Sequence, residues 1–260
     1  HDGLRLLWSL LKCKDDKVRA NSAGALSILL DTPQNLNYMS QTLMSGLPVL
    51  LDQLRSDVRE VQSNACAMVG VVSKSPAVLG VMTENGLLRL VAKLTVTPHD
   101  IVRKQVAFAI AHCCSYGDNK AVFGQQRVSA GGVVMSAVAA LVPYLKSHDI
   151  EVLRMTAVAM MHLSEDYDNA SALREAGAVE PLVDLMGRGD ELLTYASAGA
   201  CAHIRYSYWY KTSQHAQGEV RDWLTKSQLT YDSRSTVISV APPTTRTAIS
   251  SITMGGPGRK

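Results

Sequence analysis

Residues 149–164 read DIEVLRMTAVAMMHLS, and this stretch decides the fold because the chain repeats its pattern four more times. Each copy starts with an apolar residue after an acidic bend, and small or aliphatic residues follow five and eight positions later. The first apolar residues, spaced 43, 41, 50 and 41 residues apart, are Val18, Val61, Val102, Val152 and Leu193. Helical blocks with a period of about 40–47 residues are typical of armadillo and HEAT arrays. The sequence therefore predicts an all-α fold, an armadillo-type right-handed α-solenoid of about five repeats.

Each block is expected to contain two shorter helices and a longer third helix. The turn before the second helix carries a glycine: Gly3, Gly46, Gly86, Gly132 and Gly177. The bend before the third helix carries an aspartate: Asp16, Asp57, Asp100, Asp149 and Asp190. Aspartate can accept hydrogen bonds from the first turn of a helix, and glycine suits a left-handed cap. Third helices are predicted near residues 16–30, 57–73, 100–114, 149–164 and 190–210, within an array that covers residues 1–224.

Core positions can be counted from the first apolar residue of each third helix, which we call offset 0. Offsets 0, +5, +8 and +11 share one side of a helix, so these residues are expected to point inward. Leu26, Ile110, Ala157 and Met160 are therefore predicted to be buried.

The fourth block is longer than the others, and residues 133–138 account for its extra length. An insertion in a repeat forms a loop or a lengthened helix on one face of the array. We expect helices over residues 119–129 and 136–145 in this block.

Composition agrees with close-packed helix layers, since 47% of the residues are hydrophobic and only 5% are aromatic. A net charge of +3 is too small to predict nucleic-acid binding. No apolar run reaches the roughly 18 residues that a membrane helix needs. The chain opens on His1 rather than Met, so we expect a piece of a longer protein.

The five cysteines form no C-x-x-C pair, and their number is odd. Cys66 and Cys201 lie at core positions of the repeat. We therefore expect reduced, buried thiols rather than disulfides.

The last part of the chain differs in composition from the repeats. After residue 226, Ser, Thr, Pro and Gly are abundant and Asp232 is the only acidic residue. Such a segment cannot bury enough apolar surface to offset the entropy lost on ordering. We predict a flexible basic tail over residues 225–260, with order fading after about residue 226.

Three histidines occupy offset +10 of successive third helices: His112, His162 and His203. In armadillo repeats this position faces the concave groove and usually carries Asn. Ile28 and Val71 occupy it in the first two blocks. Two interpretations stand: a row of partner-contacting residues, or half-buried histidines bonded to neighbouring carbonyls.

Metal binding and catalysis are both disfavoured by the repeat. Equivalent residues on stacked helices lie about 8–10 Å apart, whereas zinc holds its histidine nitrogens at about 2.1 Å. Every candidate nucleophile or base is already accounted for by its place in a block. We expect no catalytic residues, no metal site and no cofactor.

Aromatic residues gather once, at the end of the last repeat: Tyr206, Tyr208, Trp209 and Tyr210. A C-terminal cap is one interpretation, because the last block has no following block to cover it. Trp and Tyr are also enriched at binding hot spots, so a partner contact at Tyr206, Trp209 and Tyr210 is the other.

Several stretches are more specific than a generic repeat. They are residues 2–12 (DGLRLLWSLLK), Cys113-Cys114 leading to Asn119, and residues 121–124 (AVFG), 141–147 (LVPYLKS), 163–166 (LSED) and 168–169 (DN). In these stretches, in register from residue 2 to about 205, the chain resembles the armadillo subunit family of the ciliary outer dynein arm docking complex. The resemblance implies the C-terminal armadillo half of such a protein.

That resemblance implies a function in the cytoplasm and cytoskeleton, at the axoneme of motile cilia. The protein would be a non-catalytic scaffold that helps anchor outer dynein arms on axonemal doublet microtubules. Its partners would be coiled-coil docking complex subunits, outer arm dynein chains and the tubulin doublet. Nucleic acid and membrane are not among them.

An adaptor that binds peptides in its groove, for transport or signalling, is the alternative. A transport adaptor needs a groove lined by Trp and Asn from successive third helices. At the Trp position this chain has Gly24, Ala67, Phe108, Val158 and Gly199. A signalling or adhesion scaffold would differ only in its partner.

Overall fold

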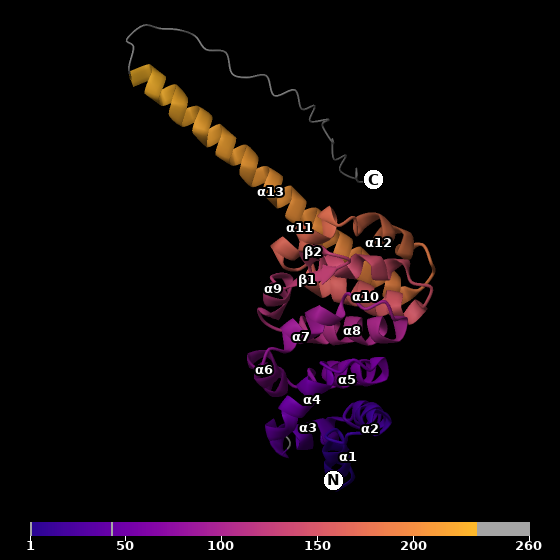
Figure 1. The fold of residues 1–260 in the computed structure, drawn as a ribbon. Helices are drawn as coiled ribbons and strands as arrows, with labels where there is room; N and C mark the ends of the chain where they lie inside the picture. Colours follow the sequence, from indigo (N-terminus) through magenta and orange to yellow (C-terminus); the bar gives the residue numbers. More distant parts are fainter. Residues whose placement is uncertain (1, 43, 233–260) are drawn as a thin grey trace, which may run out of the picture. The chain divides into compact units, whose positions relative to one another are not determined.

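The computed structural model describes residues 2–42 and 44–232 of the chain. It divides into two compact units, residues 1–212 and 213–260. The first unit holds the helical blocks (Figure 1). In the second, the described residues 213–232 form the end of the last helix.

The helices follow the repeat that the sequence predicts. The first two blocks contain α1 (Asp2–Leu10), α2 (Asp16–Leu29), α3 (Pro33–Thr42), the 3-10 turn η1 (Met44–Gly46), α4 (Leu47–Gln53) and α5 (Arg59–Val72). The third contains α6 (Pro76–Glu84), α7 (Leu87–Leu94) and α8 (Asp100–Cys113). The last two contain α9 (Asn119–Gly124), β1 (Arg127–Ala130), β2 (Val133–Ser136), the 3-10 helix η2 (Ala139–Lys146), α10 (Ile150–Leu163), α11 (Tyr167–Glu175), α12 (Val179–Met186) and α13 (Glu191–Asp232).

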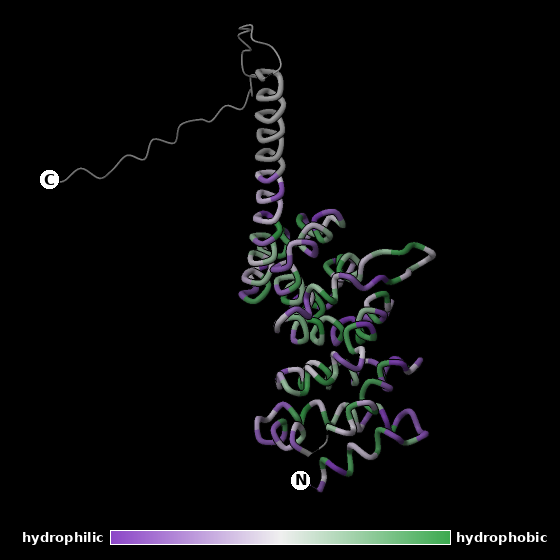
Figure 2. Tube along the Cα trace, turned by 90° about the vertical axis from the view of Figure 1, so that its left-hand side faces the viewer, coloured by the Kyte–Doolittle hydropathy of each residue, from purple (hydrophilic) through white to green (hydrophobic). Residues whose placement is uncertain are grey.

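The third helices stack in sequence order, each packed on its predecessor: α5 on α2, α8 on α5, and α10 on α8 (Figure 1). Along these helices hydrophobic residues alternate with hydrophilic ones, as Figure 2 shows. The predicted armadillo-type solenoid is confirmed, and it is mostly helical. Among the helices of residues 2–42 and 44–232, none is long and apolar enough to cross a membrane.

The predicted core is also confirmed. Leu26, Ile110, Ala157 and Met160 are all fully buried. The exceptions to the inward offsets lie in the first and last layers, where only one side has a neighbouring third helix. They are Val18, Leu29, Ala198 and Cys201, which are half-buried or exposed.

Two of the predicted aspartate caps form. Asp149 accepts a hydrogen bond of 2.8 Å from the Glu151 amide, and Asp190 accepts one of 2.9 Å from the Leu193 amide. Asp16 and Asp100 instead lie inside the first turn, where each pairs with an arginine three residues later. Asp15 and His99 occupy the N-cap positions of those two helices, and Val58 that of α5, one residue after Asp57.

The prediction for the fourth block is wrong in its middle part. Helix α9 ends at Gly124, and the expected helix over residues 119–129 gives way to the antiparallel hairpin of β1 and β2. The turn consists of Gly131 and Gly132, whose φ angles of 56° and 83° suit a two-residue hairpin turn. β-branched residues such as Val133 and Val134 favour the strand that follows. The second helix of the block is the 3-10 helix η2, which contains Pro143.

The boundary between the array at 1–224 and the flexible tail at 225–260 stays a prediction. Helix α13 continues to Asp232, past the expected third helix at 190–210 and past residue 226. The compact first unit ends at Thr212, twelve residues before the predicted end of the array. The rest of the predicted tail, residues 233–260, lies outside the described residues.

Candidate partner-binding surface

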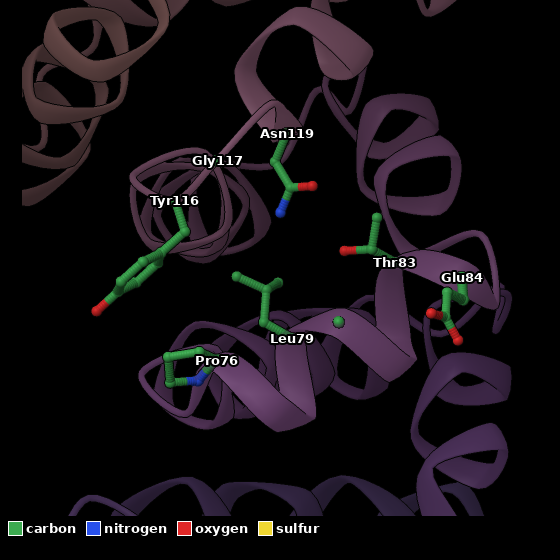
Figure 3. A pocket seen from close by; sticks show the side chains of 8 residues that line it. Pro76, Leu79, Thr83, Glu84, Tyr116, Gly117 and Asn119 are labelled. Carbon is green, nitrogen blue, oxygen red and sulfur yellow. The ribbon is translucent and has the colours of Figure 1, made fainter.

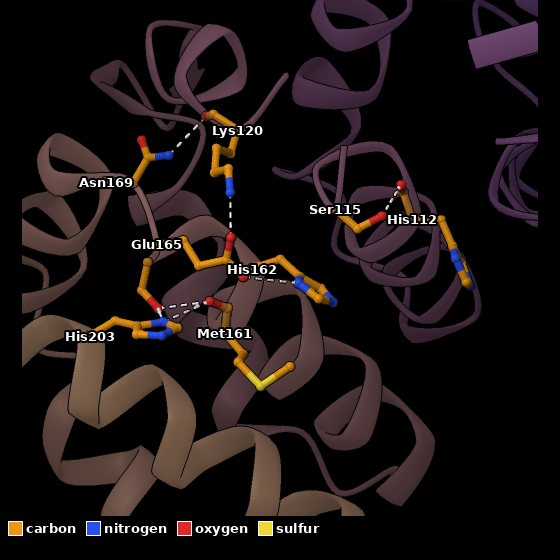
Figure 4. A network of polar contacts seen from close by, with 9 residues as sticks. His112, Ser115, Lys120, Met161, His162, Glu165, Asn169 and His203 are labelled. Atoms are coloured by element: carbon orange, nitrogen blue, oxygen red, sulfur yellow. Dashed lines mark hydrogen bonds and ion pairs between the residues drawn. The ribbon is translucent and has the colours of Figure 1, made fainter. Parts of the chain in front are cut away.

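The three offset +10 histidines lie on α8, α10 and α13, one on each of three successive layers (Figure 4). All three are half-buried. Their surroundings differ, however, so each ring is held in place by a different kind of contact.

His112 packs against Phe108 on its own helix. The two rings meet edge to face, with centroids 4.6 Å apart and planes at 79°. Burial lowers the pKa of His112, and the nearby charges of Lys74 and His162 lower it further. His112 is therefore neutral at pH 7, and no residue of the described chain forms a hydrogen bond with its ring nitrogens.

His162 belongs to a charged network between two layers. Its Nδ1 lies 3.4 Å from Oε1 of Glu165, which also forms an ion pair with Lys120 (Figure 4). Burial acts to raise the pKa of Glu165, but the hydrogen bonds and charges of Lys120 and His162 outweigh it and leave the pKa lowered. This carboxylate is therefore charged at neutral pH, where it holds the His162 ring and Lys120 together.

His203 bridges α13 and α10. Its Nδ1 lies 3.2 Å from the carbonyl oxygen of Met161 and 3.2 Å from Oγ of Ser164. A carbonyl oxygen can only accept, so Nδ1 carries the proton and donates. His203 thus matches the interpretation in which a half-buried histidine is bonded to a neighbouring carbonyl.

Three positions after these histidines come Ser115 and Glu165, in the turns that follow α8 and α10, and Tyr206 within α13. We call offsets +10 and +13 together the polar lane. Its members are Ile28, Asp31, Val71, Lys74, His112, Ser115, His162, Glu165, His203 and Tyr206. Asp31 and Lys74 form an ion pair between the first two layers. The lane therefore carries charges or hydrogen-bonding groups in all five blocks, either on the third helix or in the turn that follows it.

Sequence reasoning found the offset +10 histidines and, at offset +13, Tyr206, but it missed Asp31, Lys74 and Glu165. The available signal was that Asp31, Lys74 and Glu165 all carry charge at the same offset. It also missed Lys120, which lies on α9 and reaches Glu165 through the stacking of layers rather than through any spacing in sequence.

A second contact joins the first helices of the last two blocks beside this network. The side-chain amide of Asn169 donates a hydrogen bond of 2.8 Å to the Lys120 carbonyl. Asn169 fits only because position 124 is glycine: a Cβ there would lie 1.7 Å from Oδ1 of Asn169. This contact fixes the backbone that carries the Lys120 side chain.

The predicted aromatic cluster is held together by ring contacts, and part of it packs against α11. Tyr210 packs edge to face against Tyr167 of α11, and the Arg174 guanidinium lies 4.5 Å from the centre of the Tyr208 ring. Tyr206 and Trp209 have centroids 6.2 Å apart and remain largely exposed. Tyr206 also stacks on Tyr210, with centroids 6.4 Å apart, so two rings of the cluster contact α11 and all four remain exposed.

The positions where a peptide-binding adaptor carries Trp are taken up by contacts between layers. Phe108 packs on Gly70, where a Cβ would lie 2.4 Å from the Phe108 ring. Met161 packs on Gly199, where a Cβ would lie 2.9 Å from the Met161 side chain. Here the large residue is on the earlier helix and the glycine is on the later one. These side chains fill space between helices, which disfavours the adaptor alternative.

The buried thiols are chemically quiet. Burial raises the pKa of Cys66 and Cys114, and it raises that of Cys113 to about 12. Cys201, predicted to be a core residue, is half-buried in the last layer. Within the described ranges, no three His, Cys, Asp or Glu side chains come close enough to hold a metal ion.

A pocket of about 360 Å³ lies between α6 and the turn that leads into α9 (Figure 3). Its lining includes Leu79, Thr83, Tyr116 and Asn119. The Thr83 hydroxyl is buried without a hydrogen-bond partner in the described chain, and it points toward the pocket. The pocket is large enough for a single partner side chain.

No protein-family model matches this sequence. The sequence is 28% identical to the Armadillo repeat-containing protein gudu of Drosophila melanogaster over 204 residues, 78% of this chain and 29% of that protein. It is 39% identical to the Outer dynein arm-docking complex subunit 2 of Bos taurus over 112 residues, 43% of this chain and 11% of that protein. The Mus musculus protein of the same name is 39% identical over 89 residues, 34% of this chain and 9% of that protein. The chain thus spans less than a third of the curated relatives it matches.

Solved structures agree on the fold. An engineered protein superposes with a TM-score of 0.66 at 25% identity, over 79% of this chain and 81% of its own. The designed armadillo repeat protein YIII(Dq)4CqI superposes with a TM-score of 0.63 at 21% identity, over 77% and 81%. The chain has the armadillo repeat fold, a class of scaffold fold that is typically non-catalytic.

Proposed function

We propose that this chain is a non-catalytic scaffold that binds other proteins along the polar lane. The observation that carries the proposal is the placement of His112, His162 and His203 with charged or polar neighbours on successive layers. Within the described residues nothing bonds the ring nitrogens of neutral His112, which can therefore bond a partner. Lys120 and Glu165, whose side chains are partly exposed, can exchange their mutual ion pair for partner charges.

We further propose that the protein docks outer dynein arms on the doublet microtubules of motile cilia. The 39% identity to docking complex subunits of cattle and mouse supports this role. The partners would be coiled-coil docking complex subunits, outer arm dynein chains and tubulin.

The experiment replaces all three lane histidines (His112→Ala, His162→Ala and His203→Ala together) in the full chain. We expect unchanged far-UV circular dichroism and loss of binding to purified coiled-coil docking subunits. The matched control is His99→Ala with His148→Ala, because both residues are exposed and lie at bends before third helices. Binding that survives the triple substitution would overturn the lane as the binding surface.

The ciliary role has a separate readout. A tagged protein should localise along the axoneme of a multiciliated cell and remain on demembranated axonemes. A wild-type chain that binds none of the three partner classes would refute the docking role and leave the scaffold class in place.

A further inference from the structure

We call the side of a third helix that is turned toward the following layer its outer face. The outer face of α13 differs from that of every other third helix. At offset +5 the residues of the first four blocks, all fully buried, are Ala23, Cys66, Ala107 and Ala157. The residue at this offset in α13, Ala198, is exposed. At offset +12 the first four blocks carry buried residues: Leu30, Ser73, Cys114 and Ser164. Arg205 occupies this offset in α13 and is exposed.

In each earlier layer, the outer face is covered by the third helix that follows. The covering residues lie at offsets +3, +6 and +10 of the following helix. Asn64 at +3 donates to the Ala20 carbonyl at 2.8 Å, Phe108 at +6 packs on Gly70, and His203 at +10 reaches Met161 and Ser164. The stack thus defines which kind of element fits this face: another helix.

One stripe of the exposed surface of α13 is apolar, and Arg205 lies beside it. We define the end face as the stripe that repeats every three or four residues along α13: Tyr195, Ala198, Ala202, Tyr206 and Trp209. The aromatic members are 68%, 65% and 61% exposed, in chain order. Small residues between rigid aromatic ones allow a helix to approach closely, and Trp and Tyr are frequent binding hot spots.

We propose that the end face binds an amphipathic α-helix of a partner protein, which carries a carboxylate opposite Arg205. The helix would continue the established stacking between layers. A guanidinium covered by an apolar helix without a counter-charge is strongly unfavourable, so the partner needs Asp or Glu there. This proposal does not depend on the role in dynein docking.

A second copy of this chain fits the end face less well. Its first layer would present offsets +3, +6 and +10 of α2, which are Asn21, Gly24 and Ile28. None of them supplies a carboxylate to Arg205. Head-to-tail stacking of copies would also produce an open-ended filament.

The test uses a defined probe and the full chain. The probe is a fluorescent peptide with the sequence of residues 149–166, taken from the helix that covers α8, with His162→Glu to supply the carboxylate. We expect binding that weakens at least tenfold in the Ala198→Glu protein and in the Arg205→Glu protein. A peptide with an additional Val158→Glu, on the side that faces the preceding layer, should not bind.

A comparison of two peptides tests whether the partner needs a carboxylate opposite Arg205. The peptide that keeps the original histidine should bind the wild-type protein more weakly than the substituted peptide, and Arg205→Glu should abolish that difference. Equal affinities for wild type and Ala198→Glu would overturn the proposal. So would the absence of binding by the substituted peptide up to about 1 mM.

Two further measurements check that the end face is free. Ala198→Glu should leave the melting temperature unchanged, whereas the equivalent buried substitution Ala157→Glu should lower it strongly. A comparable loss for both would show that the face is already covered and would contradict the proposal. Sedimentation that shows dimers in the wild type and monomers in Ala198→Glu would identify a second copy as the occupant, and would also overturn it.

Discussion

The hydroxyl of Tyr144 donates a buried hydrogen bond of 2.8 Å to the carbonyl oxygen of Thr95 and ties the fourth layer to the third. A counterpart joins the first two layers, where the Gln53 amide donates to the Leu11 carbonyl at 3.1 Å. In both cases, a second-helix side chain satisfies a carbonyl in the turn that ends the preceding second helix. Buried backbone groups in such turns need a partner, because water cannot reach them.

Tyr144→Phe removes this hydrogen bond and leaves the Thr95 carbonyl without a partner. We expect a loss of about 1–3 kcal/mol in the free energy of unfolding, measured by urea denaturation. Tyr116→Phe is the control, since Tyr116 is exposed and its hydroxyl lies outside the core. Equal stability of the Tyr144→Phe protein and the wild type would show that the bond contributes nothing net.

Gly70→Ala should destabilise the array although alanine favours helices. The new methyl group would lie 2.4 Å from the Phe108 ring, which would have to move together with the His112 ring that meets it edge to face. We expect a cost of about 1–3 kcal/mol in thermal or urea unfolding.

Two variants make this result specific. Gly80→Ala, in helix α6 with open space around it, should be neutral or stabilising by up to about 1 kcal/mol. Phe108→Leu should restore stability to the Gly70→Ala protein. If Gly70→Ala is as harmless as Gly80→Ala, then Phe108 of α8 does not pack closely on Gly70 of α5.

Ile110→Asp should unfold its layer and the layers beside it, because an unpaired buried carboxylate costs several kcal/mol. Ile101→Asp on the same helix is the matched control, with 56% of its surface exposed. We expect the control to change stability by no more than about 0.5 kcal/mol. Circular dichroism melting curves distinguish the two, and similar curves would mean that the helix faces have been misassigned.

Glu165→Gln should lower stability at neutral pH and have less effect in acid. The pKa of Glu165 is lowered in the folded protein, so its contribution is present above the ordinary glutamate value of 4.5 and is lost as the pH falls through the folded value. The difference in melting temperature between the variant and the wild type should therefore shrink below pH 4.5. In a Lys120→Met background the difference at neutral pH should be much smaller, and an unchanged difference would refute the coupling of the two residues.

Much of the fold follows from the sequence, because in a stack of helices the inward side of each helix is set by spacing alone. The offsets that place Ile110 and Met160 in the core depend only on the 3.6-residue helical period. The same reasoning located the three histidines. It failed for the hairpin, where Gly131 and Gly132 act through a local turn that no repeat period reveals.

The contacts of the lane were less predictable, for a different reason. Lys120 reaches Glu165 across 45 positions of sequence, and His203 reaches the Met161 carbonyl across 42. Which side chains meet depends on the rotation of one layer on the next. That rotation is set by the sizes of residues packed between helices, and it leaves no periodic signal in the chain.

The paired sizes at the interfaces between layers have an evolutionary consequence. Phe108 fits because Gly70 lies opposite it, and Met161 fits because Gly199 lies opposite it. A tandem duplication of the third block would set Phe108 against Ala111, the counterpart of Gly70, and create the overlap that Gly70 avoids. This array could therefore not have lengthened by copying its third block without a compensating change. The order of its repeats is therefore constrained by the matched residue sizes at each interface between neighbouring blocks.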